Sequence, residues 1–179
     1  MLYFLTTNQN KFEEVKAILA PLQIEQLSID LPEIQDLDAY KIMQAKLQEA
    51  LKHHPGELIV EDTSLYLDAL NGLPGPLIKW FLPTLGLDGL ANLATKLGNT
   101  KATAKTIIGY AQDAEHIHFF EGELKGDIVP PRGKINFGWN AIFQPEGSTM
   151  TFAEMSVEQK NQLSMRKLAV EKFKEFKQS

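Results

Sequence analysis

The sequence predicts an α/β fold in which an elongated mixed β-sheet is flanked by helices. Two observations support this prediction. Short apolar runs alternate with segments of helical apolar spacing through the first half of the chain. Two longer stretches rich in β-branched and aromatic residues then follow each other closely, like the strands of an antiparallel hairpin. With 179 residues and no internal repeat or linker, the chain is expected to form a single domain over residues 1–179.

The first elements are predicted from runs in the N-terminal third. Leu2–Leu5 is apolar and rich in aromatic residues, which indicates a buried strand. The apolar residues of Phe12–Ala20 recur at three- and four-residue steps and predict a helix. A second strand is expected at Ile24–Leu27, and the spacing within Tyr40–Leu51 predicts a second helix. The apolar run Leu58–Val60 is expected to be the third strand.

The remaining elements lie beyond a glycine- and proline-rich loop. A short helix is expected near Ile78–Leu82 and another around Leu87–Leu97. The predicted hairpin has Ala102–Ala111 and Ile117–Leu124 as its strands, with the polar residues between them as its turn. Further helices are expected from Ser156 onwards.

Composition excludes several classes of function. The chain has no cysteine, which rules out disulfides and thiolate metal sites, and we assign none of its four histidines a role. A formal net charge of −5 argues against broad nucleic-acid binding, for which a basic surface is expected. The N-terminal run lacks the basic flank of a signal peptide, and no segment is long enough to span a bilayer. We therefore expect a cytoplasmic protein with no nucleic-acid partner and no membrane association.

Two adjacent acids, Glu61 and Asp62, follow the predicted third strand and precede the glycine-rich loop. Carboxylates in such a place suit Mg²⁺, which prefers oxygen ligands and binds through one or two carboxylates plus substrate phosphates. Polar residues also end many strands without any further role. The two acids taken alone leave both interpretations open.

A polar segment, Thr6 to Lys11, joins the predicted first strand to the predicted first helix. Thr7 or Asn8 can cap the helix, and the N–H groups of the first turn can bind an anion. Capping alone would explain the threonine and the asparagine. It does not call for Lys11, since the helix dipole favours acids in a first turn.

Three further clusters have residue types suited to ligand binding. Glu33 lies in an extended loop and can supply a third carboxylate. Phe137 and Trp139 flank a glycine and can present two rings to one planar guest, although core packing explains such rings equally well. Lys160 and Ser164 recur on one face of a C-terminal helix, where a solvated charged face is the simpler explanation. Together, carboxylates, lysines, aromatic rings and donors describe a site for a nucleoside triphosphate.

Seven short motifs, in order along the chain, resemble those of the inosine triphosphate pyrophosphatase family. They are Thr6-x-Asn8-x-x-Lys11, Leu31-Pro32-Glu33-x-Gln35, Val60-Glu61-Asp62-Thr63, Gly72-Leu73-Pro74-Gly75-Pro76, Phe137-Gly138-Trp139, Thr151-Phe152-Ala153-Glu154-Met155 and Lys160-Asn161-x-x-Ser164-x-Arg166. The resemblance covers nearly the whole chain. It implies hydrolysis of a noncanonical purine triphosphate, such as ITP, dITP or XTP, to the monophosphate and pyrophosphate. It also implies a homodimer.

The resemblance implies roles for individual residues. Asp62 would be the general base and Lys11 would stabilise charge on the phosphates. Mg²⁺, with Mn²⁺ as the alternative, would be held by Glu33, Asp62 and Glu61. The residues expected to bind substrate are Thr6, Thr7, Asn8, Lys11, Lys46, Thr63, Lys79, Phe137, Trp139, Asn140, Lys160, Ser164, Met165 and Arg166.

Two positions depart from the family pattern in the part that would contact the base. Asn140 stands where the family usually has aspartate, and Met165 stands where it has histidine. An amide both donates and accepts, whereas a thioether offers the base edge almost nothing. One alternative is therefore the same chemistry redirected to another or modified base. A second alternative is a nucleotide sensor that does not hydrolyse its ligand.

Overall fold

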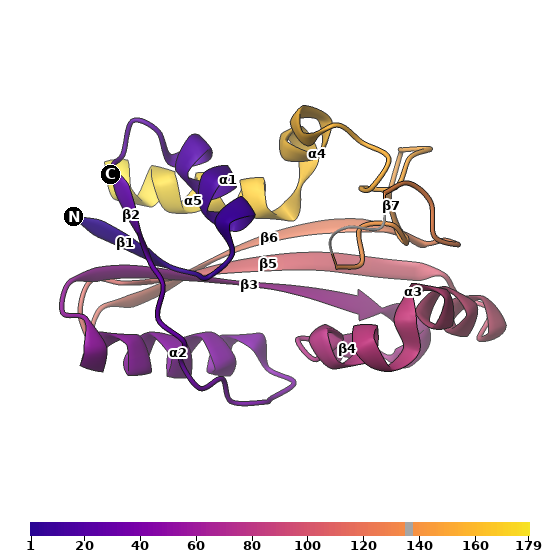
Figure 1. Cartoon of the computed structure of the whole chain (residues 1–179), viewed down its shortest axis with the longest axis horizontal. Helices are drawn as coiled ribbons and strands as arrows, with labels where there is room; N and C mark the ends of the chain where they lie inside the picture. The colour runs from indigo at the N-terminus through magenta and orange to yellow at the C-terminus, as the bar shows by residue number, and fades with distance from the viewer. Residues whose placement is uncertain (135–137) are drawn as a thin grey trace. The chain divides into compact units, whose positions relative to one another are not determined.

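The computed structural model describes residues 1–134 and 138–179. The strands are β1 (Leu2–Leu5), β2 (Ile24–Leu27), β3 (Glu57–Leu67), β4 (Pro74–Gly75), β5 (Lys101–Ala111), β6 (Ile117–Ile128) and β7 (Phe143–Pro145). They are hydrogen-bonded in the order β2-β1-β3-β5-β6-β7, and β4 pairs with β3 (Figure 1). β1 runs parallel to β2 and β3, whereas β3 is antiparallel to β4 and β6 to β7. The predicted α/β class with a mixed sheet is confirmed.

The helices are α1 (Gln9–Leu19), α2 (Ala39–His53), α3 (Ile78–Lys96), α4 (Val157–Leu163) and α5 (Met165–Gln178), with a 3-10 turn at Asp68–Leu70. Each predicted helix has a counterpart in this set. Within the described residues, no helix combines the length and the apolar character needed to cross a membrane.

β3 is longer than the predicted strand, which ended at Val60. It continues to Leu67, so Glu61 and Asp62 lie inside the strand and do not terminate it. The continuation contains threonine, leucine and tyrosine, residue types common in strands, and Leu65 and Leu67 are buried at alternate positions on one face of it. The charge of Glu61 misled the prediction because its partners lie far away in the sequence.

α3 contains a break at Gly86. This glycine has φ 69° and ψ 177°, a backbone conformation that a residue with a Cβ rarely adopts, and helical residues flank it on both sides. The two helices predicted near Ile78–Leu82 and around Leu87–Leu97 are therefore the two parts of α3. The sequence placed them correctly, and Gly86 explains why their apolar spacings do not run on continuously.

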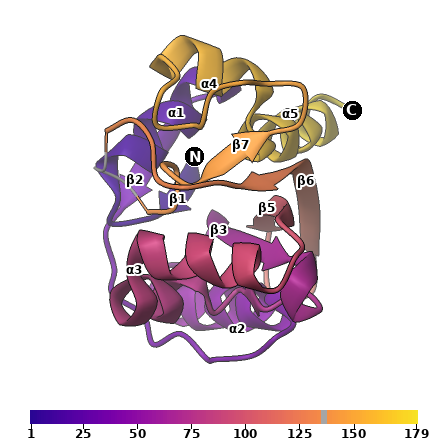
Figure 2. The same ribbon diagram turned by 90° about the vertical axis from the view of Figure 1, so that its right-hand side faces the viewer.

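The chain forms two compact units, each built from segments distant in sequence. Unit 1 comprises residues 1–63, 106–122 and 165–179, and unit 2 comprises residues 64–105 and 123–164. Unit 1 therefore contains β1, β2, α1, α2 and α5, together with the parts of β3, β5 and β6 that fall in its ranges. Unit 2 contains β4, α3, β7 and α4, and Figure 2 shows β7 alongside β6.

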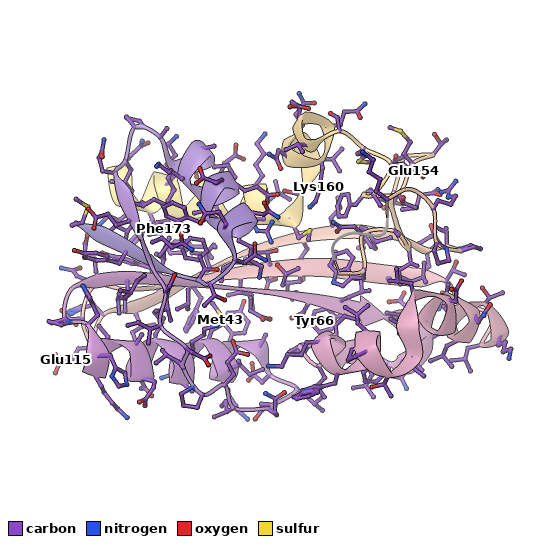
Figure 3. All side chains as sticks on the ribbon, viewed as in Figure 1. Met43, Tyr66, Glu115, Glu154, Lys160 and Phe173 are labelled. Atoms are coloured by element: carbon purple, nitrogen blue, oxygen red, sulfur yellow. The ribbon has the colours of Figure 1, made fainter. Side chains whose placement is uncertain are left out.

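Unit 1 has a hydrophobic core on each face of its sheet. On one face, Ile59 packs with residues of α1 and α5 that include Phe12 and Phe173. On the other face, Val60 packs with residues of α2 that include Met43. Figure 3 shows Phe173 and Met43 on opposite sides of the strands. Burial of these apolar side chains is the main force holding α1, α2 and α5 on the sheet.

A polar cluster ties the end of α5 to the sheet of unit 1. The Tyr110 hydroxyl donates to Glu57 Oε1 at 2.5 Å, and Lys177 Nζ lies 2.7 Å from the same oxygen and 3.1 Å from the hydroxyl. Burial and the bond to Glu57 raise the pKa of Tyr110. Burial by itself would lower the pKa of Lys177, but the bonds of Lys177 to Glu57 and Tyr110 raise this pKa above its ordinary value. The bonds from Lys177 and Tyr110 lower the pKa of Glu57 in spite of burial. The cluster therefore stabilises the fold fully between the ordinary pKa values of glutamate, 4.5, and tyrosine, 10.0, and loses that contribution at lower and at higher pH.

Tyr110→Phe should lower the free energy of unfolding by about 2 kcal/mol at pH 7, because it removes the hydrogen bond that the hydroxyl donates to Glu57 and the one that it accepts from Lys177. It should also weaken the loss of stability as the pH rises above 10.0, since the phenol no longer titrates. Urea unfolding at several pH values measures both effects. Tyr3→Phe, a half-buried tyrosine outside this cluster, is the matched control. Equal alkaline sensitivity in the two variants would contradict the assignment.

Candidate functional site

The loop between β1 and α1 is shaped by its own polar side chains. Asn8 caps α1, since its Oδ1 accepts from the Lys11 backbone N–H at 3.1 Å, and Thr6 Oγ1 accepts from the Asn8 N–H at 3.1 Å. Thr7 is exposed. The pairing of β1 with β3 reaches Phe4 opposite Ile59, so the chain leaves the sheet almost level with Glu61. Capping is thus confirmed, and it brings the first turn of α1 beside the acidic part of β3.

Glu61 is the centre of a buried charge cluster. Its side chain has no exposed surface, its Oε2 lies 2.8 Å from Lys11 Nζ, and its Oε1 lies 3.6 Å from Arg166 Nη2. Arg166, 5% exposed, forms a second ion pair with Glu14 of α1. Two cations and two carboxylates thereby balance one another. Such a cluster is stable only while every member keeps its partner, because each lone charge would be costly to bury.

Threonines complete the environment of Glu61. Thr63 Oγ1 donates to Glu61 Oε1 and lies 2.9 Å from Thr106 Oγ1 on β5. Burial by itself would raise the pKa of Glu61, but Lys11, Arg166 and the bond from Thr63 lower it to about 2. Glu61 is therefore ionised at any neutral pH. Its charge also favours the ionised form of Arg166, whose pKa is raised in spite of burial.

Asp62 faces the other side of β3. Successive residues of a strand point to opposite faces, and Ile59 and Val60 already divide between the two cores in this way. Glu61 shares the face of Ile59, towards α1 and α5, so half-buried Asp62 shares the face of Val60, towards α2. Although the two acids are adjacent in sequence, their side chains do not converge.

Glu33 and Lys46 form an ion pair on the α2 side of unit 1. Lys46 Nζ of α2 lies 2.5 Å from Glu33 Oε1 in the loop that precedes the helix. Both side chains keep part of their surface exposed, 32% for Glu33 and 19% for Lys46. A predicted metal ligand and a predicted phosphate-binding lysine are therefore neighbours.

The described residues include oxygen donors suited to a hard cation, but these donors do not form a complete set of protein ligands. Within residues 1–134 and 138–179, no group of three or more His, Cys, Asp or Glu side chains is arranged to hold a metal ion. Mg²⁺ does not require such a group, because it keeps water ligands and binds through one or two carboxylates together with substrate phosphates. Glu33 and Asp62, both on the α2 side, fit that mode of binding.

The predicted base-binding residues fall mainly in unit 2. Trp139 is 6% exposed and packs against Phe143 and Phe152, with ring centroids 5.4 and 6.3 Å apart. Lys160 Nζ lies 5.8 Å from the centroid of the Phe152 ring, and Figure 3 shows Lys160 on α4. Core packing is therefore at least part of the role of Trp139. Phe137 lies outside the described residues.

The other predicted positions occupy helix ends and turns. Asn140 is half-buried, and its carbonyl accepts from the Ala153 N–H at 3.2 Å. Ser164 ends α4, and the next residue, Met165, begins α5; both are buried. Lys79, in the first turn of α3, lies 5.6 Å from the ring of Trp80. These contacts connect the predicted residues to local structure within unit 2 or at the start of α5.

Sequence reasoning missed two members of the buried cluster in unit 1. Glu14 lies three residues after Lys11, on the same face of α1, and this spacing could have revealed it. Thr106 is fully buried in β5, within a run of strand-forming residues that carries no functional pattern. Only the pairing of β3 with β5 shows that Thr106 meets Thr63.

Comparison with known proteins gives consistent matches over almost the full length. A model of the Ham1 family matches residues 2–176. A protein named inosine triphosphate pyrophosphatase from Puccinia graminis f. sp. tritici is 42% identical, and the match covers 97% of this chain and 95% of that protein. A protein of the same name from Schizosaccharomyces pombe is 43% identical, and the match covers 98% of this chain and 94% of that protein. A solved HAM1 protein from Coxiella burnetii is similar in fold, with a TM-score of 0.86 at 22% identity and 99% coverage of both chains. The Staphylococcus aureus Ham1 protein gives 0.80 at 24% identity, over 99% of this chain and 98% of that one.

Proposed function

The chain belongs to the Ham1 family, and from this premise we propose that it is a nucleoside triphosphate pyrophosphatase. It hydrolyses noncanonical purine triphosphates, ITP, dITP and XTP, between the α- and β-phosphates and thereby clears them from the nucleotide pool. Relatives named inosine triphosphate pyrophosphatase, 42% to 45% identical, support this substrate class. The structural observation that carries the proposal is the combination in unit 1 of a capped helix start with Lys11, the Glu33–Lys46 pair and Asp62.

We propose that Glu33 and Asp62 hold Mg²⁺, with Mn²⁺ as the alternative. When bound, the ion would lower the pKa of a water and offset charge on the phosphates. Glu61 stays a prediction as a third ligand. Its two cationic neighbours, and its position on the opposite face of β3 from Asp62, favour instead a role in positioning Lys11 and Arg166.

Asp62 is the proposed general base. It accepts a proton from the water whose oxygen attacks the α-phosphorus, while the bond from that phosphorus to the pyrophosphate oxygen breaks. Lys11 and the N–H groups at the start of α1 stabilise the negative charge that develops on the phosphate oxygens. The ion pair with Glu61 fixes the direction of the Lys11 side chain, so that little reorganisation is needed when substrate binds.

The remaining predicted contacts divide between the two ends of the nucleotide. The residues proposed to bind the phosphates are Thr6, Thr7, Asn8, Lys11, Lys46, Thr63 and Lys79. The residues proposed to bind the base are Phe137, Trp139, Asn140, Lys160, Ser164, Met165 and Arg166. We also propose that residues 1–179 act as one catalytic domain, that the protein is a homodimer and that it is cytoplasmic.

Pyrophosphate release with Mg²⁺ tests the proposed function. The substrates to compare are ITP, dITP, XTP, the four common ribonucleoside triphosphates and several modified purines. Highest kcat/KM for ITP and XTP is the expected result. A maximum at another base would show that Asn140 and Met165 have redirected selectivity, and binding without turnover of any base would identify a sensor.

Met165→His should raise the preference for ITP over ATP about tenfold, because the added imidazole supplies one hydrogen-bonding partner to the base edge. The ratio of kcat/KM for the two substrates is the measurement. Met165→Leu, which keeps the position apolar, is the control and should leave the ratio unchanged. Met165 is 4% exposed. If both variants only lose stability, its side chain serves packing and does not contact the base.

A further inference from the structure

Gly122 on β6 lies directly against the first turns of α5. A Cβ built on this glycine would be 2.0 Å from the Met165 carbonyl oxygen, 2.8 Å from the Ala169 nitrogen and 2.9 Å from the Leu168 Cβ. Two of these three atoms belong to the backbone, which cannot move aside as a flexible side chain can. Any side chain at position 122 would therefore displace the start of α5.

The start of α5 carries Arg166, whose guanidinium must reach two carboxylates. Arg166 is the second residue of the helix and pairs with Glu14 of α1 and with Glu61 of β3. Because the guanidinium is 5% exposed and Glu61 has no exposed surface, water has little room to bridge a widened gap. A shift of the first turn would therefore break these pairs.

A second contact holds the same strand and helix together. Lys172 Nζ donates to the carbonyl oxygen of Glu121 at 2.7 Å, next to Gly122 and nearly two turns along α5 from Arg166. The strand thus meets α5 at two points, one of close backbone contact and one of hydrogen bonding. Of the two, only the close contact lies beside Arg166.

We propose that Gly122 is a positioning residue, which sets the depth of α5 on β6 and so places Arg166 between Glu14 and Glu61. Through Glu61 it also fixes Lys11, the cation that contacts the phosphates. The expected effect of Gly122 on turnover rests on the proposed function. The placement of Arg166 is a property of unit 1 and does not depend on it.

Gly109 offers a matched control on β5. The three atoms nearest to a Cβ there are all side-chain atoms, with Leu47 Cδ1 at 3.0 Å and Met43 Cε and Val60 Cγ2 at 3.2 Å. These side chains belong to the core on the α2 face. Gly109→Ala therefore crowds unit 1 as Gly122→Ala does, but away from α5 and Arg166.

A double-mutant cycle with Arg166→Met separates positioning from general damage. Gly122→Ala should lower kcat/KM for ITP about ten- to a hundredfold, the range expected for a misplacement of about 1 Å. In the Arg166→Met background the same change should cost several-fold less, since one of the groups it positions is gone and only the displacement of Met165 remains. Gly109→Ala should have the same effect in both backgrounds. An equal loss from Gly122→Ala in both backgrounds would overturn the proposal.

Urea unfolding without nucleotide tests the placement independently of turnover. Gly122→Ala should lower the midpoint more in the presence of Arg166 than in the Arg166→Met background, because only then does it also break the ion pairs. Equal shifts in both backgrounds would overturn the proposal. A wild-type protein that releases no pyrophosphate from any triphosphate would instead refute the proposed function, and the unfolding cycle would still decide the role of Gly122.

Lys172→Met provides a milder variant if Gly122→Ala does not fold. It removes the second contact between β6 and α5 without adding an atom to their interface. We expect a loss of about threefold in kcat/KM for ITP, at the low end of coupling between neighbouring groups, and only when Arg166 is present. A loss of the same size in the Arg166→Met background would contradict the role of the α5–β6 contact.

Discussion

Asp62→Asn is expected to reduce pyrophosphate release from ITP by about a hundred- to ten-thousandfold, the range typical for loss of a general base. Asparagine keeps the shape of the side chain but cannot accept a proton from water at neutral pH. The residue is half-buried on the α2 face of β3, so the substitution leaves the buried cluster around Glu61 in place. Stability should therefore change little while turnover is lost.

The measurement is kcat for ITP with saturating Mg²⁺, accompanied by urea unfolding of the same samples. Asp88→Asn, an exposed acid on α3 outside the proposed site, is the control and should retain wild-type turnover. If Asp62→Asn keeps more than about a tenth of the wild-type rate, the proton acceptor lies elsewhere and the assignment of Asp62 fails.

Glu61→Gln is expected to have the largest effect on stability. Removing one partner from a buried ion pair typically costs about 3–5 kcal/mol, because the opposite charge stays buried without compensation. Here two cations, Lys11 and Arg166, would be left with Glu14 as the remaining carboxylate of the cluster. Turnover should fall as well, since the side chain of Lys11 loses the group that directs it.

The pH dependence identifies the charge of Glu61 as the cause. Its pKa falls from the ordinary 4.5 to about 2 in the folded state, so its contribution is fully present above about pH 4.5 and is lost as the pH falls towards 2. A shift of this size corresponds to about 3 kcal/mol at neutral pH. The difference in unfolding free energy between wild type and Glu61→Gln should therefore be largest at pH 7 and shrink steadily below pH 4.5.

Urea unfolding between pH 3 and 7, with EDTA to remove divalent cations, measures this difference. Glu175→Gln, an exposed acid of α5, should give a difference that stays small at every pH. A constant gap between wild type and Glu61→Gln across the whole range would show that packing, and not charge, makes Glu61 important.

The sequence predicted most of the fold because local patterns were sufficient for it. Apolar runs such as Leu2–Leu5 and helical spacings such as that of α2 depend on neighbours in sequence, and both were confirmed. β4 and β7 were missed because strands of two and three residues carry almost no periodicity. β3 was cut short because a charged residue inside a strand looks like an end unless its distant partners are known.

The candidate site was predictable only in part, for the same reason. Lys11, Glu61 and Arg166 were singled out from motifs, and the structure brings these three together in unit 1. The opposite directions of Glu61 and Asp62 could not be foreseen while both were thought to follow the strand. Thr106 and Gly122 carry no signal of their own, because each acts through contact with a segment more than forty residues away.

Unit 1 is assembled from segments that lie far apart in the sequence, and this has a consequence for biosynthesis. The core on one face of its sheet includes three residues of α5, which are Ala169, Val170 and Phe173. In addition, Lys174 Nζ of α5 donates to the carbonyl oxygens of Ile18 and Ala20 at the end of α1. A ribosome makes β1 and α1 well before α5, the helix that packs against them. During synthesis the apolar surface of α1 and β1 therefore lacks this cover until α5 emerges, and we expect chaperones that bind exposed apolar segments to contact the nascent chain in that interval.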